Sequence, residues 1–233
     1  MQAVIFAAGQ GKRLRPLTET TPKPMLEVSG RPILAYLLDS LPECIDEIIL
    51  VVGYLSHRIE AHFGSEYKGR SIRYAHQREL LGTFDALHAA GPYLLNLPFL
   101  CLVGDDFYHP QDLEELTRYD PAMLVMEKDD PGRFSVCIER NGFLHDIISP
   151  VQNHSGRNLV FTGACVLTKD IFEEAIIYNH QNEQSLPLMM VSLSRRLPIR
   201  MIHARFWHSI TYPGDLAEAE RTAINIIGQQ KNQ

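Results

Sequence analysis

Apolar residues in this chain form short runs, and between these runs apolar and polar residues alternate at helical spacing. The runs predict strands, and the amphipathic segments, many closed by glycine or proline, predict helices. Up to residue 130 the expected strands are Ala3–Ala8, Glu47–Val52, Ser71–Ala75, Phe99–Val103 and Met123–Glu127. The expected helices are Ile33–Leu41, Ser56–Phe63, Thr83–Ala90 and Leu113–Tyr119. This alternation predicts an α/β fold with a doubly wound, mostly parallel (Rossmann-like) sheet and helices on both faces.

The regular alternation of expected strands and helices ends after residue 130. Phe134–Glu139 and Phe143–Ile148 flank Asn141-Gly142, a strong signal for a hairpin turn, so we expect a mixed, antiparallel second half. The other expected elements are strands Asn158–Leu167 and Ile199–Phe206, and helices Ile171–Tyr178, Leu188–Arg195 and Asp215–Ile227. No linker rich in glycine, serine or proline divides the chain, so residues 1–233 are expected to form one domain.

Composition narrows the class of protein. Of the 233 residues 45% are hydrophobic and 21% charged, the balance of a globular protein. The net charge of −6 argues against a nucleic-acid binder. No run approaches the roughly 18 apolar residues of a membrane span, and the opening residues do not resemble a signal peptide. No Cys-x-x-Cys or paired-histidine spacing indicates zinc, and the four cysteines fit small buried residues of a reducing cytoplasm.

The most informative segment is Ala7–Leu34, AAGQGKRLRPLTETTPKPMLEVSGRPIL. It follows the first expected strand, so it lies at the edge where open α/β sheets bind ligands. Gly9 and Gly11 allow the backbone to approach a phosphate closely. Between Gly11 and Arg31 five basic residues face two acidic ones, which suits a polyanion such as a nucleoside triphosphate. The basic residues are Lys12, Arg13, Arg15, Lys23 and Arg31.

Several other motifs are excluded. The turn lacks the spacing and the hydroxyl of a P-loop, and Leu14 replaces the third small residue of a dinucleotide fingerprint. No Gly-x-Ser-x-Gly motif of a serine hydrolase is present. Taken alone, the Gly-x-Gly turn is equally consistent with a turn that only closes a strand.

At full length the segment resembles the signature of the sugar-1-phosphate nucleotidyltransferases, also called nucleotide-sugar pyrophosphorylases. The resemblance continues over essentially the whole chain, at Gln77–Thr83, Gly104-Asp105, Thr162-Gly163 and Pro213–Leu216. Members of this family join a nucleoside triphosphate to a sugar 1-phosphate and release pyrophosphate. The resemblance therefore makes residues 1–130 the nucleotide-binding half and 131–233 the acceptor-binding half, and it leaves a homo-oligomer open.

The family pattern assigns roles to individual residues of the first half. Arg13 would stabilise the charge on the leaving pyrophosphate, and Lys23 would bind the α-phosphate or the sugar phosphate. Asp105 would hold Mg²⁺, which prefers carboxylates, phosphates and water. Gln77 and Gly82 would read the edge of a pyrimidine, which favours UTP or dTTP. The full expected nucleotide-binding set is Ala8, Gly9, Gly11, Lys12, Gln77, Gly82 and Thr83.

The second half departs from the family pattern. Ser209 stands where relatives carry a second acidic or amide metal ligand. Ser135 replaces a glycine, and Ile148-Ser149-Pro150 replaces a Glu-Lys-Pro motif, so Lys169 or Arg157 would have to substitute for that lysine. Gly163 is retained, so we expect Gly163, Ser135 and Ser209 to bind the acceptor.

These departures leave other functions open. The chain could use an unusual phosphorylated acceptor, or it could be a non-catalytic or regulatory homologue that binds nucleotide-sugars. A cytidylyltransferase for a non-sugar phosphate, such as phosphocholine, is a third alternative.

Overall fold

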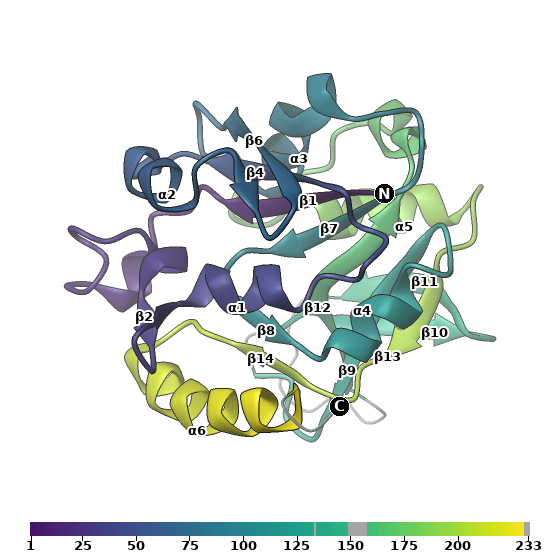
Figure 1. Ribbon diagram of the computed structural model, residues 1–233. Helices are drawn as coiled ribbons and strands as arrows, with labels where there is room; N and C mark the ends of the chain where they lie inside the picture. The colour runs from purple at the N-terminus through teal and green to yellow at the C-terminus, as the bar shows by residue number, and fades with distance from the viewer. Residues whose placement is uncertain (133, 149–157, 231–233) are drawn as a thin grey trace.

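The structure is a computed structural model that describes residues 1–132, 134–148 and 158–230, and side chains of α6 up to residue 221. Figure 1 shows a central sheet covered by helices, which confirms the α/β class. In the described residues the main sheet has ten strands. They are β1 (Gln2–Ala7), β4 (Glu47–Val52), β5 (Glu66–Tyr67), β6 (Arg70–His76), β7 (Phe99–Val103), β9 (Ala122–Lys128), β10 (Val136–Arg140), β11 (Phe143–Ile148), β12 (Asn158–Leu167) and β13 (Arg200–His203).

Two short strand pairs and six α-helices complete the described fold. The pairs are β2 (Glu27–Val28) with β3 (Arg31–Pro32), and β8 (Asp106–Tyr108) with β14 (Trp207–Ser209). The helices are α1 (Ile33–Asp39), α2 (Ser56–Phe63), α3 (Thr83–Ala90), α4 (Pro110–Leu116), α5 (Leu186–Ser194) and α6 (Pro213–Gln230). Short 3₁₀ turns are η1 (Lys12–Leu14), η2 (Lys23–Met25), η3 (Gly91–Tyr93) and η4 (Lys169–Glu173).

The strand order indicates at which edge of the sheet a ligand would bind. Strands β6, β4, β1 and β7 are adjacent in that order and all parallel. From β1 the chain goes first to one side, to β4 and β6, and then to the other side, to β7. In open α/β sheets the crevice for a ligand lies at such a reversal, outside the carboxyl ends of the two strands. Here those ends belong to β1 and β7.

Beyond β7 the sheet is mixed. The antiparallel strand β12 lies between β7 and β9, so β9 runs in the same direction as β7 without pairing with it. The expectation of a mostly parallel sheet therefore holds for β6–β4–β1–β7 and fails at β9. Hydrophobic periodicity identifies β7 and β9 as strands, but it does not predict that β12 will lie between them.

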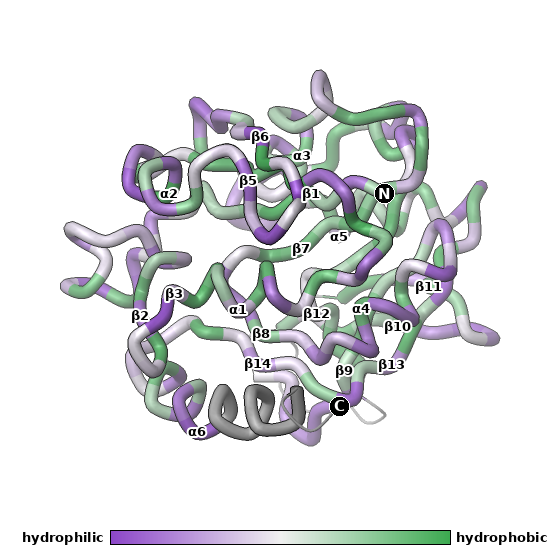
Figure 2. The backbone as a smooth tube through the Cα atoms, in the orientation of Figure 1, coloured by the Kyte–Doolittle hydropathy of each residue, from purple (hydrophilic) through white to green (hydrophobic). Residues whose placement is uncertain are grey.

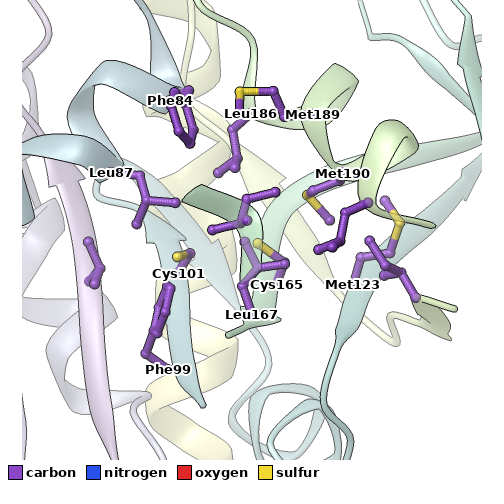
Figure 3. Close-up of a cluster of buried hydrophobic side chains, with 14 of the residues drawn as sticks. Phe84, Leu87, Phe99, Cys101, Met123, Cys165, Leu167, Leu186, Met189 and Met190 are labelled. Carbon is purple, nitrogen blue, oxygen red and sulfur yellow. The ribbon is translucent and has the colours of Figure 1, made fainter. Parts of the chain in front are cut away.

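Each face of the sheet carries its own layer of helices, because successive strand residues point to opposite faces. Val4 and Cys101 pack with α3 and α5, whereas Ile5 and Leu102 pack with α1, α2 and α4. Figure 2 shows hydrophobic residues concentrated along the central strands and polar residues along the outer loops. Figure 3 shows the first of these layers, where Phe84 of α3 and Met190 of α5 cover the strands.

Two expected elements are wrong in the second half. The helix expected over Ile171–Tyr178 is only the 3₁₀ turn η4, because the chain then extends and Tyr178 pairs with Gln184 in an isolated bridge. The strand expected over Ile199–Phe206 ends at His203, and a separate strand, β14, follows. The buried Asp112 fixes this break by accepting hydrogen bonds from the Arg205 and Phe206 amides, at 2.7 and 3.2 Å.

The cysteines are mostly as expected. Cys101, Cys137 and Cys165 are buried, and Cys101 and Cys165 face each other across β7 and β12 as free thiols. Cys44 is exposed, so the interpretation of all four as buried residues is wrong for Cys44. Among the described residues, no helix combines the length and the apolar character needed to cross a membrane.

Candidate active site

A cavity of about 540 Å³ opens at the carboxyl ends of β1 and β7, where the strand order reverses. Its wall combines the loop after β1, the start of α3 and the turn after β7. Ten of the residues singled out from the sequence line it: Ala8, Gly9, Gly11, Lys12, Arg13, Lys23, Gln77, Gly82, Thr83 and Asp105. The fold thus brings together the expected catalytic, nucleotide-binding and metal-binding residues of the first half.

The glycine-rich loop is shaped around Gly11, whose φ is +59°. Its carbonyl accepts hydrogen bonds from the Leu14 amide at 2.9 Å and from Thr18 Oγ1 at 2.8 Å. A Cβ at this position would lie 2.9 Å from Thr18 Cγ2, so glycine is required. The tight turn buries Leu14 against α6 and leaves Lys12 and Arg13 as exposed cations on the cavity wall.

Lys23 and Asp105 form an ion pair inside the cavity. Lys23 begins η2, between Pro22 and Pro24, and Asp105 follows the end of β7. Their side chains are only 17% and 12% exposed, so their charges interact with little screening by water. The two residues for which the sequence suggests phosphate and metal binding are therefore direct neighbours.

Gln77, Gly82 and Thr83 also line the cavity. Gln77 Nε2 donates to the Gly82 carbonyl at 3.1 Å and to Asp85 Oδ2 at 2.7 Å. Gly82 has a φ of +125°, and a Cβ there would lie 2.4 Å from the Gln184 carbonyl oxygen. The glycine is therefore required by a backbone contact with Gln184, in addition to any room that it leaves for a base.

Two lining residues from the second half of the chain, Glu183 and Thr211, were missed from the sequence. Glu183 reaches the cavity because Gln184 pairs with Gly82, and Thr211 because it follows β14. Neither position carries a motif, so only the long-range pairing could have identified them.

Asp106 is buried beside the cavity and contacts the second half of the chain. It lies opposite Ser209 in the β8–β14 pair, and it accepts a hydrogen bond from Trp207 Nε1 at 2.9 Å. Burial raises the pKa of Asp106 to about 6, although Lys23, Trp207 and Ser209 favour the charged form. The hydroxyl of Ser209 thus faces a carboxylate supplied by β8.

The donor set fits a magnesium ion that takes most of its ligands from a substrate. Asp105 supplies one carboxylate to the cavity. In the described part of the chain no group of three or more His, Cys, Asp or Glu side chains could hold a metal. Mg²⁺ is commonly held by one or two carboxylates together with phosphate oxygens and water, and this site has that chemistry.

The expected acceptor residues are not part of the cavity wall. Of the described residues that line it, none is Ser135, Gly163 or Ser209. Gly163 has a φ of +84°, and a Cβ there would lie 2.4 Å from Val103 Cγ2, on the cavity wall. Ser209 Oγ is 3.4 Å from Thr211 Oγ1, and Ser135 follows Phe134, whose ring packs on Trp207.

The structure excludes Lys169 as a substitute for the missing lysine. Leu167, at the end of β12, pairs with Phe99 at the start of β7. Lys169 therefore lies at the amino edge of the parallel strands, opposite the cavity. Ser149, Pro150 and Arg157 lie outside the described residues.

Comparison with known proteins shows the family of this chain. The family described as nucleotidyl transferase matches residues 2–123, more than half of the chain. UTP–glucose-1-phosphate uridylyltransferase AglF of Haloferax volcanii is 35% identical, over 95% of this chain and 96% of the relative. This chain belongs to the sugar-1-phosphate nucleotidyltransferase family. The bifunctional protein GlmU of Methanocaldococcus jannaschii is 32% identical over 97% of this nucleotidyltransferase, which spans 55% of GlmU.

Solved structures share the fold of this nucleotidyltransferase at lower identity. UDP-glucose pyrophosphorylase in complex with UDP-glucose has a TM-score of 0.83 at 19% identity, over 96% of this chain and 98% of that structure. The inositol-1-phosphate CTP transferase of T. maritima has a TM-score of 0.80 at 21% identity, over 97% and 95%. Both likenesses concern the fold alone.

Proposed function

We propose that this nucleotidyltransferase transfers the nucleotidyl group of UTP or dTTP to a sugar 1-phosphate, with glucose 1-phosphate as the first candidate. The observation that carries the proposal is the cavity at the ends of β1 and β7, which Lys12 and Arg13 line together with the ion pair of Lys23 and Asp105. Such a concentration of cations suits a triphosphate, and AglF, whose name gives the same reaction, aligns over nearly the full chain.

In the proposed reaction an oxygen of the sugar 1-phosphate attacks the α-phosphorus of the triphosphate. The bond between the α-phosphorus and its bridging oxygen breaks, and pyrophosphate leaves with that oxygen. Arg13 and Lys12 stabilise the charge that develops on the pyrophosphate, and Lys23 binds the α-phosphate beside Asp105. Asp105 would hold Mg²⁺, which neutralises phosphate charge when bound.

We propose that the two substrates bind to different halves of the chain. We assign the nucleotide to residues 1–130, with their Rossmann-like, doubly wound strand arrangement, and the acceptor to residues 131–233. We assign the nucleotide base to Gln77, Gly82 and Thr83, which line the cavity and favour a pyrimidine. The free thiols of Cys101 and Cys165, which face each other across two strands, support a reducing, cytoplasmic compartment.

The test is pyrophosphate release from UTP, dTTP, CTP and GTP, each paired with several sugar 1-phosphates and Mg²⁺. We expect turnover with UTP or dTTP. Arg13→Ala should lower kcat about 10²- to 10³-fold without changing the circular dichroism spectrum, because one charge-stabilising donor is lost. Arg15→Ala is the matched control, since Arg15 is also exposed in the loop but does not line the cavity.

Two outcomes would contradict the proposal. Folded protein that binds UDP-glucose but releases no pyrophosphate would indicate a non-catalytic homologue, which Ser209 leaves open. Turnover confined to CTP and a non-sugar phosphate would indicate a cytidylyltransferase.

A further inference from the structure

Lys128 is a half-buried cation at the carboxyl end of β9. Its Nζ lies 5.4 Å from the centre of the Trp207 ring and 5.6 Å from that of Phe134. Among the described residues no carboxylate lies within ion-pair distance of it. A partly desolvated ammonium held only by ring faces can accept an anionic ligand at little cost.

The sheet places Lys128 at the same edge as the cavity. Strands β7 and β9 are both antiparallel to β12, so Lys128 and Val103 lie at the same edge of the sheet. Trp207 connects Lys128 to that centre, because its indole N–H donates to Asp106. Ser209 lies two residues beyond Trp207, so both side chains lie on one face of β14, roughly 7 Å apart along the strand.

A second polar group adjoins Lys128. Asn158 is its register partner on β12, so the two side chains lie on the same face of the sheet. Asn158 is only 8% exposed, and its Nδ2 donates to the Asp129 carbonyl at 3.0 Å. Its Oδ1 has no hydrogen-bond partner among the described residues. A buried acceptor of this kind suits a hydroxyl group of a ligand.

We propose that Lys128 binds the phosphate of the sugar 1-phosphate, with the Phe134 and Trp207 rings forming the wall beside it. This inference rests on the proposed function, which requires a cation for the acceptor. Lys169 lies at the opposite edge of the sheet and cannot supply this cation, so the inference assigns the role to Lys128 of β9. When the acceptor binds, the ammonium exchanges ring contacts for a charge-assisted hydrogen bond to the phosphate.

Trp207 provides a direct readout, because it is the single tryptophan of the chain. The wild-type protein is saturated with a non-hydrolysable UTP analogue and Mg²⁺, and then titrated with glucose 1-phosphate, inorganic phosphate or glucose. The change in tryptophan fluorescence gives each dissociation constant. We expect Lys128→Met to weaken glucose 1-phosphate and inorganic phosphate about 10- to 100-fold, the loss typical of a bond between charged partners, and to leave glucose unchanged.

The controls separate charge from structure. Lys128→Arg should retain most of the affinity, and Lys169→Met removes another half-buried lysine from the opposite edge of the sheet. Binding of the UTP analogue should stay the same in all three variants. Unchanged affinity for glucose 1-phosphate in Lys128→Met, or an equal loss for glucose, would overturn the inference.

Failure of the proposed function would look different. In the pyrophosphate assay, wild-type turnover with an unchanged KM for glucose 1-phosphate in Lys128→Met contradicts only the role of Lys128. A fluorescence response that depends on Lys128, without any turnover, supports the phosphate site and contradicts catalysis.

Discussion

At the residue scale, the site depends on positions where a side chain cannot be added. Gly11, Gly82 and Gly163 all have positive φ, and in each case a Cβ would approach a neighbouring atom within 3.0 Å. At Gly163 that neighbour is Val103, which lines the cavity. Close contacts between elements, and not only backbone conformation, therefore fix the cavity wall.

Gly163→Ala measures the contribution of this contact. Gly142 has nearly the same φ, +83° against +84°, but a Cβ there would meet no atom within 4 Å. We expect Gly142→Ala to lower the unfolding free energy by about 1–2 kcal/mol, the cost of the left-handed conformation. Gly163→Ala should cost a further ~1–3 kcal/mol, because the methyl group overpacks against Val103. Equal losses in urea denaturation would show that the contact with Val103 relaxes freely.

At the element scale, one ion-pair cluster connects α1 to two short strands. Asp39, at the end of α1, accepts hydrogen bonds from Arg31 at 2.7 Å, Lys68 at 2.6 Å and the Tyr67 hydroxyl at 2.9 Å. Burial by itself raises the pKa of Asp39, but the bonds from Lys68, Arg31 and Tyr67 outweigh it and hold the pKa below its usual value. One carboxylate thus joins α1 to β3 and β5.

This ion-pair cluster predicts a specific pH dependence. Because the pKa of Asp39 is lowered in the folded state, its stabilisation is complete above the unfolded pKa of about 3.9, and it is lost as pH falls through the lower folded pKa. We expect Asp39→Asn to lower the unfolding free energy by about 1–3 kcal/mol at pH 7. The difference from wild type should shrink below pH 4. A difference that stayed constant from pH 7 to pH 2 would contradict a contribution from the charge.

At the scale of the whole molecule, the strand order gathers the site from distant parts of the chain. The loop after β1, the turn after β7 and the residues after β14 meet around one cavity, although Gly9 and Thr211 are far apart in sequence. Ligands that bridge these parts should therefore stabilise the entire fold, because they bind only when all the parts are assembled.

Thermal unfolding tests this coupling. UTP with Mg²⁺ at about 100 times its Kd should add about 2.7 kcal/mol of stability, a rise in Tm of roughly 5–10 °C. EDTA should remove the part that depends on the metal, and Asp105→Asn should remove the same part. Asp46→Asn, at the opposite edge of the sheet, is the control, since Asp46 pairs with the amino terminus. If EDTA left the Tm with UTP unchanged in wild type, Asp105 would not hold a metal.

Local pattern in the sequence was sufficient for much of the first half. The limits of β4, α2, α3 and β7 are as predicted, because periodicity and terminating glycines act within a few neighbouring residues. The glycines and cations after β1 also predicted a ligand site at the carboxyl edge of the sheet, where the cavity opens, because the carboxyl end of a parallel strand has a defined position in such folds.

Only the tertiary structure decided the acceptor side. The insertion of β12 between β7 and β9, and the pairing of β8 with β14, place Ser209 opposite Asp106 and Lys128 beside Trp207. No local pattern around Lys128 or Trp207 indicates that they meet. Strand pairing over long separations depends on which edges remain open once other elements have packed, and the chain resolves this only when it folds as a whole.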